Sequence, residues 1–262
     1  MMTKNVLAIH DISCVGRCSM TVALPILSRY GVECRLLPTG LLSTHTGGFT
    51  DYTFLDLTDE MRKILAAWKP LGLQFDGIYS GYLGSAEQVE LVKEVVAAYG
   101  APFYCDPVMA DGGALYPGFD ITFVEKMREL VPLADVLMPN VTEACFLTGM
   151  PFSETVAPQT LIEKLRAMGA KAVVLTGVEQ SADSIGALAS DGALYQTAKI
   201  GGSYHGTGDI FGSVLVSALT NGQTLSDAMR AACDFVVAAI KATPASADKK
   251  YGVNFEDVLA EK

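Results

Sequence analysis

One glycine-rich turn is the part of the sequence best suited to chemistry: His205-Gly206-Thr207-Gly208-Asp209. It follows a strand-like segment and opens straight into an apolar helix, which we predict over residues 210–219. Two glycines let backbone N–H groups turn inward, and a helix N-terminus adds partial positive charge, so this turn is expected to bind an anion. A carboxylate beside a bound phosphate is repelled by it unless it has a chemical role. General base for a hydroxyl that attacks the phosphate would be such a role for Asp209.

Two further segments carry oxygen atoms that suit a metal ion or a phosphate. Asp106 and Asp111 lie five residues apart directly after a predicted strand, and Mg²⁺ prefers carboxylate oxygens while it keeps several waters. The alternative is a turn aspartate and a solvated one. Asn140 and Glu143 lie three residues apart at the start of a helix and could hold a metal-bound water and a phosphate oxygen. An ordinary N-cap with a first-turn acid is the alternative there.

The elements that must position these residues alternate between strand-like and helical patterns from the start of the chain. This alternation predicts a mostly parallel sheet with right-handed crossovers. The predicted strands are residues 6–10, 34–37, 77–80, 103–105, 136–138 and 172–175. The predicted helices are residues 18–30, 59–68, a helix opening at Ser85, 121–131, 158–168, 210–219 and 225–242.

The sheet is expected to end in an antiparallel edge. Residues 185–189 and 193–200 flank Ser190-Asp191-Gly192, a good hairpin turn. The chain after Thr243 is expected to be loosely ordered. Ligands of open parallel sheets bind at the carboxyl ends of the strands, where most of the polar and glycine-rich segments of this sequence lie.

Composition limits the classes of function. The chain has 262 residues, of which 50% are hydrophobic and 18% charged, which suits a single α/β domain over residues 1–262. A net charge of −10 argues against nucleic acid or an anionic membrane as partner, but not against a small phosphate ligand. Six cysteines without paired spacing, and no secretory signal, predict reduced thiols in a cytoplasmic protein.

The order and spacing of four motifs resemble the ribokinase-like superfamily of ATP-dependent small-molecule kinases: strand-Asp-Pro-Val, Pro-Asn-x-x-Glu, Leu-Thr-Gly and Gly-Thr-Gly-Asp. Within it the chain is most similar to pyridoxal kinases, which phosphorylate the hydroxymethyl group of pyridoxal, pyridoxamine or pyridoxine. This narrower resemblance rests on His45-Thr46-Gly47, Gly81-Tyr82, Cys105-Asp106-Pro107-Val108 and Val131-Pro132-Leu133-Ala134-Asp135. It implies a three-layer sandwich with a mostly parallel central sheet, helices on both faces, an antiparallel edge and no separate lid domain, assembled as a homodimer.

The resemblance also implies roles for individual residues. Asp209 would be the base, and the backbone of Gly206, Thr207 and Gly208 would complete the anion hole. The substrate would be bound by Asp11, Ser13, His45, Thr46, Tyr82 and Asp209. ATP would be bound by Asp106, Asn140, Glu143, Thr176, Gly177 and Thr207, and its Mg²⁺ by Asp106, Asp111 and Glu143. A monovalent cation is a further candidate cofactor, and residues 112–118 would form a flap that closes over the reactants.

Other functions stay open at this point. Asp11 stands where many pyridoxal kinases carry serine, and the segment from Ser13 to Cys18 is also similar to the hydroxymethylpyrimidine kinases of thiamine synthesis. Those enzymes commonly have cysteine where Asp209 stands, which favours pyridoxal. A sugar kinase ranks third, because extra N-terminal lid strands are lacking. A vitamer-binding protein without turnover is expected to lose Asp209 or the anion-hole glycines, and both are present.

Overall fold

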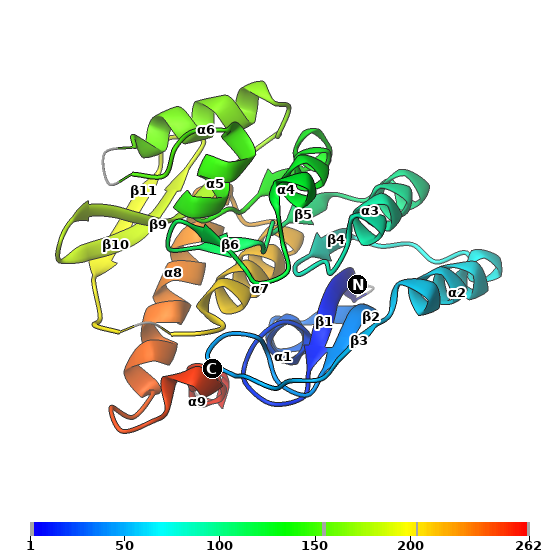
Figure 1. Ribbon diagram of the computed structural model, residues 1–262, viewed down its shortest axis with the longest axis horizontal. Coiled ribbons are helices and arrows are strands. Elements are labelled where there is room, and N and C mark those ends of the chain that lie inside the picture. Colours follow the sequence, from blue (N-terminus) through cyan, green and yellow to red (C-terminus); the bar gives the residue numbers. More distant parts are fainter. Residues whose placement is uncertain (1–2, 154–155, 203, 261–262) are drawn as a thin grey trace. The chain divides into compact units, whose positions relative to one another are not determined.

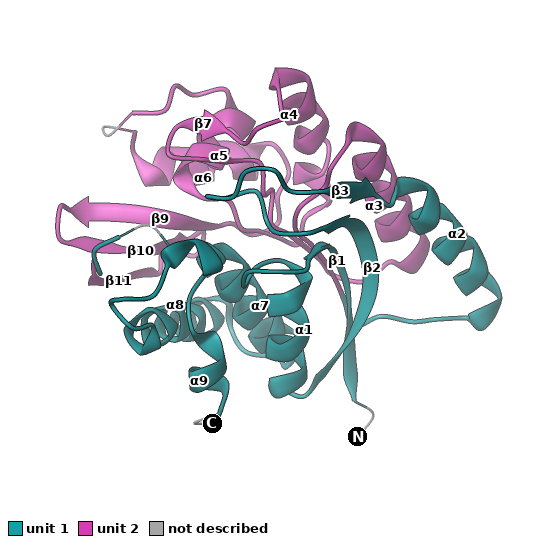
Figure 2. Ribbon diagram, turned by 60° about the horizontal axis from the view of Figure 1, so that its bottom comes forward, with its two compact units in different colours: residues 1–77, 200–262 teal, residues 78–199 magenta. Residues whose placement is uncertain are grey.

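The computed structural model describes residues 3–153, 156–202 and 204–260 (Figure 1). Its contacts divide the chain into two compact units, drawn in different colours in Figure 2. Unit 1 comprises residues 1–77 and 200–262, and unit 2 comprises residues 78–199. The single domain expected over residues 1–262 stays a prediction, and each unit is described by itself.

Unit 1 is built around the first strand. β1 (Lys4–Ser13) pairs in parallel with β2 (Val32–Leu42), which pairs antiparallel with a short strand that the sequence pattern did not predict, β3 (Phe54–Asp56). The apolar run of β1 is fully buried, as expected of a strand covered on both faces. His10 is buried with it, and burial lowers its pKa to about 3. The register with β2 shifts between His10 and Ile12, because β2 has one extra residue opposite Asp11.

Helices pack on this sheet from both ends of the sequence. α1 (Met20–Arg29) contacts α7 (Thr207–Thr220), and α7 contacts α8 (Leu225–Ala242). α7 is apolar nearly all round, and its residues 210–218 are buried. α2 (Thr58–Trp68) and the 3₁₀ turn η1 (Lys69–Leu71) complete the N-terminal part.

Residues 244–260 are ordered, so the expectation of a loose end was wrong for the part after Thr243 that the structure describes; residues 261–262 lie outside it. It forms the 3₁₀ turn η3 (Lys249–Tyr251) and the short helix α9 (Phe255–Ala260). Val253 and Phe255 are buried, and the burial of these apolar side chains holds the segment against the rest of unit 1 although its composition is mostly polar and small.

Unit 2 contains two sheets. In the first, β4, β5 and β8 pair in parallel in that order; in the second, β9, β10 and β11 form the predicted antiparallel edge around residues 190–192. A parallel bridge between Leu137 and Val173 links the two. The bounds are β4 (Gly77–Ser80), β5 (Phe103–Cys105), β8 (Val136–Leu137), β9 (Val174–Ser181), β10 (Ser184–Ala189) and β11 (Leu194–Ala198).

Helices connect the strands of unit 2. The predicted cap of α3 (Ala86–Tyr99) is confirmed, because the Ser85 hydroxyl accepts from the Gln88 N–H. α4 (Ile121–Arg128) ends earlier than predicted, and a 3₁₀ turn, η2 (Val131–Leu133), follows at Pro132, which cannot continue an α-helix. α5 (Val141–Thr148) and α6 (Pro158–Ala167) follow. Before α4 lies a small hairpin that we did not predict, formed by β6 (Ala110–Asp111) and β7 (Ala114–Leu115).

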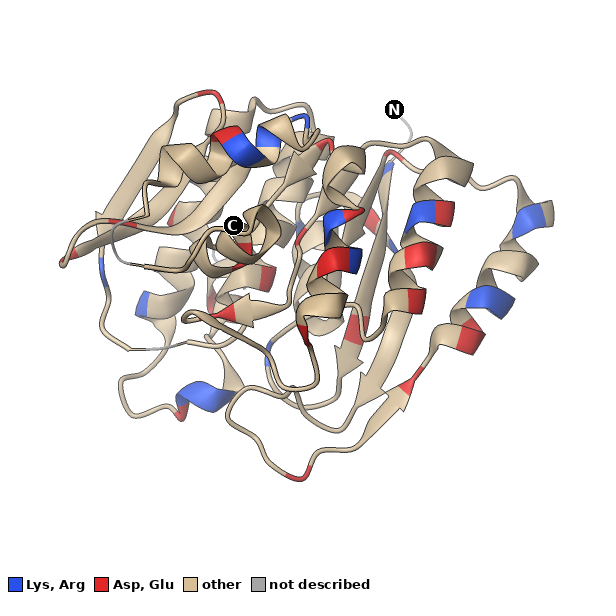
Figure 3. Cartoon of the chain, turned by 45° about the horizontal axis from the view of Figure 1, so that its top comes forward, with Lys and Arg blue, Asp and Glu red and all other residues tan. Residues whose placement is uncertain are grey.

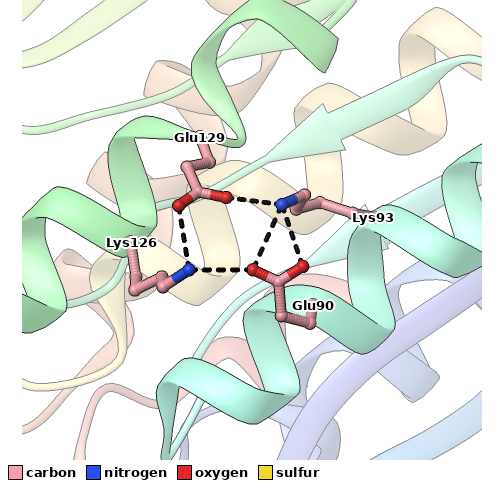
Figure 4. Close-up of polar contacts among 4 residues, drawn as sticks. All are labelled: Glu90, Lys93, Lys126 and Glu129. Carbon is pink, nitrogen blue, oxygen red and sulfur yellow. Dashed lines mark hydrogen bonds and ion pairs between the residues drawn. The ribbon is translucent and has the colours of Figure 1, made fainter.

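Charges of both signs line α3 and α4 (Figure 3). Glu90 accepts from Lys93 and Lys126 at 2.9 and 3.0 Å, and Glu129 accepts from the same two lysines (Figure 4). The Lys93 hydrogen bond, followed by that of Lys126, lowers the pKa of Glu129 to about 2. This network ties α4 to α3 at the surface.

Candidate active site

The glycine-rich turn forms the N-terminus of α7. The helix begins at Thr207, three residues before the predicted start, so Asp209 lies in its first turn. Gly206 is the N-cap with a φ of 78°, and a Cβ added to it would overlap the carbonyl oxygen of Arg17. Only glycine therefore fits both the conformation and the space. The Thr207 hydroxyl donates to the carbonyl oxygen of Tyr204 at 3.3 Å.

Asp209 lies in an environment that favours its protonated form. Its carboxyl group is closely surrounded by protein, and this burial raises its pKa to about 7. The charge of Asp11 raises it further, while the nearby backbone N–H of Ser19 acts in the opposite direction. A carboxyl that titrates near neutrality can both accept and release a proton at physiological pH.

The buried carboxyl group of Asp11 lies beside it. Asp11 is 4% exposed and accepts the Ser13 hydroxyl at 2.8 Å. Burial raises the pKa of Asp11, and the nearby Ser19 and Ser13 hydroxyls oppose that shift. Burial also raises the pKa of the Cys18 thiol well above the usual range, so it stays protonated. The structure thus brings the predicted residues Asp11, Ser13 and Asp209 together.

The loop after β2 is held in place by hydrogen bonds of the His45 ring. Its Nδ1 accepts the N–H of Gly47 at 3.1 Å, and its Nε2 lies 2.6 Å from the carbonyl oxygen of Lys250. A neutral imidazole has one donor and one acceptor nitrogen, so Nε2 carries the proton and donates to Lys250. Burial lowers the pKa of His45, in keeping with this neutral form. Thr46, half-buried, is the next residue of the fastened loop.

In unit 2, Asn140 and Glu143 form a capping box at the start of α5. The Asn140 side chain accepts the Glu143 N–H, and the Glu143 carboxylate accepts the Asn140 N–H, both at 2.9 Å. The other oxygen of Glu143 accepts the N–H of Met109 at 3.1 Å, and the Asn140 amide donates to the carbonyl oxygen of Ala110. This pair therefore ties the chain after β5 to the N-terminus of α5.

Glu143 is 3% exposed, and burial raises its pKa to about 7, with the charge of Asp111 adding to the shift. Asp106 is buried directly after β5, whereas Asp111 is exposed. Among the described residues, no three His, Cys, Asp or Glu side chains are grouped closely enough to hold a metal ion by themselves. Asp106, Asp111 and Glu143 thus form no protein-only cage.

The other nucleotide-site candidates lie on the next strand. A parallel bridge joins Thr176 to Asn140, and the Thr176 N–H donates to the carbonyl oxygen of Pro139 at 2.9 Å. Gly177 follows with a φ of 72° and is exposed. Asn140 and Glu143 therefore follow β8, whereas Thr176 and Gly177 lie within β9, which extends to Ser181 beyond the predicted strand end at residue 175.

Tyr82 and the expected flap are also in unit 2. The Tyr82 ring lies 5.6 Å from that of Phe119, which stacks on Phe123 at 4.1 Å. Part of the flap, residues 112–118, belongs to the β6–β7 hairpin, which is held to α5 by a 3.0 Å hydrogen bond from the Gly113 N–H to the Thr142 hydroxyl. Asp11, Ser13, His45, Thr46 and the turn at Asp209 belong to unit 1.

Sequence reasoning missed two contributors to the unit 1 cluster. Ser19 lies near both carboxyl groups, but a serine before a helix looks like an ordinary cap. The η3 segment was missed because its Lys250 bonds His45 through a backbone carbonyl, which leaves no side-chain signal.

Comparisons with known proteins place this geometry in a family. A pyridoxal kinase from Lactobacillus plantarum superposes with a TM-score of 0.92 at 33% identity, covering 100% of this chain and 96% of that one. A Bacteroides thetaiotaomicron protein assigned as a phosphomethylpyrimidine kinase and crystallised with pyridoxal gives a TM-score of 0.93 at 35% identity, covering 99% and 96%.

A hydroxymethylpyrimidine/phosphomethylpyrimidine kinase from Haemophilus influenzae is 36% identical over 174 residues, which are 61% of this chain and 63% of that enzyme. The solved structures confirm the predicted ribokinase-like α/β fold, with its mostly parallel central sheet, surrounding helices and antiparallel edge. The model of the phosphomethylpyrimidine kinase family matches residues 29–254, well over half of the sequence. The chain therefore belongs to the phosphomethylpyrimidine kinase family.

Proposed function

We propose that the chain is a pyridoxal kinase, which transfers a phosphoryl group from ATP to the hydroxymethyl group of pyridoxal, pyridoxamine or pyridoxine. The observation that carries this proposal is Asp209: a carboxyl with a pKa of about 7 in the first turn of a helix whose N-cap only glycine can occupy. The relatives support the substrate class, since one is a pyridoxal kinase and another was crystallised with pyridoxal.

In this reaction Asp209 removes the proton from the attacking hydroxyl. With a pKa of about 7 the carboxylate is populated at neutral pH and still basic enough to accept a proton. The backbone N–H groups at the start of α7, at Gly206, Thr207 and Gly208, provide fixed dipoles for the charge on the transferring phosphoryl group. Phosphoryl transfer requires little of a protein beyond positioning the reactants and stabilising the charge of the transition state.

Mg²⁺ would accompany ATP and neutralise phosphate charge, with Asp106, Asp111 and Glu143 as its protein partners. The residues fit such an ion, because the charge of Asp111 adds to the burial that disfavours ionised Glu143, and a cation would offset both. Each Glu143 oxygen already accepts a backbone N–H but keeps further acceptor capacity, which suits contact through a metal-bound water. An ion held mostly by phosphate and water is typical of Mg²⁺. A monovalent cation stays a further candidate cofactor.

The remaining candidates divide between direct contact and positioning. Asp11 and Ser13 offer polar atoms beside Asp209, and Thr46 and Tyr82 are proposed to face the pyridine ring, Tyr82 by stacking. For His45 we infer a positioning role, because both ring nitrogens are already hydrogen-bonded to the backbone. Asp106, Asn140, Thr176, Gly177 and Thr207 are proposed to contact the nucleotide.

Hydroxymethylpyrimidine is the second candidate substrate. The family model is named for phosphomethylpyrimidine kinase, and the Haemophilus relative is named a hydroxymethylpyrimidine/phosphomethylpyrimidine kinase. Its ring is flat and bears a similar hydroxymethyl group, so the same base and anion hole would serve it. The aspartate at position 209 favours the pyridine vitamers.

The setting of the enzyme is also proposed. In the described part of the chain, no helix combines the length and apolarity needed to cross a bilayer. We propose a cytoplasmic homodimer whose partners are ATP and a vitamer, with no nucleic acid and no membrane.

One assay tests the proposal. ATP consumption by the purified protein with Mg²⁺ is measured against pyridoxal, pyridoxamine, pyridoxine, hydroxymethylpyrimidine and ribose, with Asp209→Ala as control. Turnover of the pyridine vitamers that is lost in the control is the expected result. Turnover of the pyrimidine alone would make the chain a thiamine-pathway kinase. Vitamer binding without ATP consumption would indicate a binding protein.

A further inference from the structure

The His205 ring lies against the loop that carries Thr46, the vitamer loop of residues 43–53. Its centroid is 5.2 Å from that of the His45 ring, and the two ring planes are tilted by 44°. A Cβ added to Gly47 would lie 2.5 Å from the Nδ1 of His205 and 2.6 Å from its Cε1. His205 directly precedes Gly206, so the side chain before the anion hole rests on the backbone of the vitamer loop.

Gly47 is required by space rather than by backbone conformation. Its neighbour Gly48 has a φ of 78°, which favours glycine, whereas the φ of Gly47 is not positive. The place that a side chain of residue 47 would take is filled by the His205 ring. Packed interiors do not accommodate overlaps of this size, so a larger residue would move either the ring or the loop.

The backbone from which this ring extends is closely enclosed as well. A Cβ added to Gly252 would lie 3.3 Å from the carbonyl oxygen of His205, and one added to Gly206 would overlap the carbonyl oxygen of Arg17. The Arg17 N–H donates to the carbonyl oxygen of Tyr251 at 3.1 Å, which joins the two enclosing segments. The turn therefore has little freedom to shift if the contact between ring and loop is changed.

The vitamer loop is packed on further rings. His45 meets Phe49 edge-on with centroids 5.0 Å apart, and Phe49 meets Tyr251 edge-on at 5.3 Å. Aromatic rings at these separations attract each other beyond the area they bury. The loop is thus held by the η3 segment through Tyr251 and by the anion-hole turn through His205.

We propose that His205 is a positioning residue whose ring, seated on Gly47, sets the separation between the vitamer loop and the anion hole. Thr46 belongs to that loop and Gly206 begins the anion hole, so one side chain holds the substrate ring at a fixed distance from the phosphoryl site. The ring acts by its shape, because a contact with a glycine backbone needs neither charge nor proton. The role in substrate binding rests on the kinase activity proposed above, but the contact itself does not.

Two substitutions of His205 separate the shape of the ring from its nitrogens. His205→Ala removes the ring and should raise the vitamer KM about three- to tenfold, as for the loss of an aromatic contact, with the KM for ATP little changed. His205→Phe keeps a flat ring without nitrogens and should recover most of that loss. An unchanged vitamer KM in His205→Ala would overturn the proposal. A His205→Phe protein as impaired as His205→Ala would overturn the role of ring shape.

Substitution of Gly47 tests the contact without catalysis. Gly47→Ala places a methyl group where the ring lies and should lower the melting temperature by roughly 2–10 °C. In the His205→Ala background that space is empty, so the same substitution should cost little. Gly201→Ala is the matched control, because its φ is not positive and the space around its Cβ is open. It should leave the melting temperature unchanged in both backgrounds.

The double-mutant cycle decides the proposal. Residues in contact give non-additive effects, so Gly47→Ala should be harmful with His205 present and nearly neutral without it. Equal losses of melting temperature in the two backgrounds would show that ring and loop are not coupled and would overturn the proposal. The vitamer KM should follow the same pattern as the melting temperature. If no vitamer turned over, the kinase function would fail while the melting cycle still decided whether His205 holds the loop.

Discussion

His45 and Lys250 are joined by a 2.6 Å hydrogen bond between the imidazole Nε2 and the backbone carbonyl oxygen of Lys250. With the Gly47 N–H bound to Nδ1, this contact fixes the ring and the loop that carries Thr46. We expect His45→Asn, whose shorter side chain cannot reach Lys250, to raise the vitamer KM by about tenfold while the KM for ATP changes little.

Lys250→Ala is the control for His45, because it retains the backbone carbonyl that accepts the bond. Its vitamer KM should stay near that of the wild type. Equal KM values for the wild type and His45→Asn would show that the hydrogen bond between His45 and Lys250 plays no part in substrate binding.

The activity should depend on pH through Asp209. Because its pKa is about 7, kcat/KM for pyridoxine should rise with pH through that value and level off above it, as the base loses its proton. A rate profile measured between about pH 5 and 9 tests this. An acid limb centred near the ordinary aspartate pKa would contradict the buried environment described for this carboxyl.

The same pKa has a consequence for stability. The folded protein holds the Asp209 proton more tightly than the unfolded chain, so between the ordinary value of 3.8 and about 7 this group makes stability fall as pH rises. Asp209→Asn should therefore stabilise the folded protein at pH 8, by on the order of a few kcal/mol of unfolding free energy, and raise its melting temperature. At pH 4 the stabilisation should be much smaller. Calorimetry at both values measures it, and an unchanged or lower melting temperature at pH 8 would count against the assignment.

The N-cap glycine of α7 should not tolerate a side chain. Gly206→Ala introduces strain at a φ of 78° and an overlap with the carbonyl oxygen of Arg17, so we expect loss of most turnover and a lower melting temperature. Gly31→Ala is a close control: its φ is 76°, but the space around its Cβ is open. It should cost only about 1 kcal/mol of stability and leave activity intact. Equal effects of the two would show that the overlap is unimportant.

Glu143→Gln should loosen the segment that follows β5. One of its two side-chain termini becomes an amide donor, which cannot accept the N–H of Met109 or Asn140. We expect a higher Mg²⁺ requirement and faster hydrogen exchange at the Met109 or Asn140 amide. Glu125→Gln, an exposed substitution of the same kind on α4, serves as the control. A Mg²⁺ titration that matches this control would contradict a role for Glu143 near the metal.

Much of the fold could be predicted from the sequence, because buried parallel strands and their helices leave strong periodic signals. The strand at residues 77–80, the strand at residues 103–105 and the helix at residues 225–242 have the bounds that periodicity predicts. The short strands β3, β6 and β7 were missed because they are mostly exposed and therefore carry no apolar run, unlike the fully buried strand at residues 103–105.

The predicted motifs at Asp209 and at Asn140 lie where the strand-end rule puts them, but the contacts that shift the pKa values of their carboxyl groups could not be predicted from the sequence. The residue type of Ser19 does not indicate a positive φ, since that conformation is set by the elements packed around it. The start of α7 was placed too late because two glycines look like a loop, although Gly208 lies inside the helix.

The His45 bond to Lys250 spans 205 positions, and the Arg17 ion pair with Glu256 spans 239. Since a ribosome releases the N-terminal end first, the loop that carries Thr46 emerges long before the carbonyl that fastens it. Activity during synthesis should therefore appear only after η3 has left the exit tunnel. A nascent chain stopped short of Lys250 would contain Asp209 and the anion hole while its vitamer loop was still unfastened.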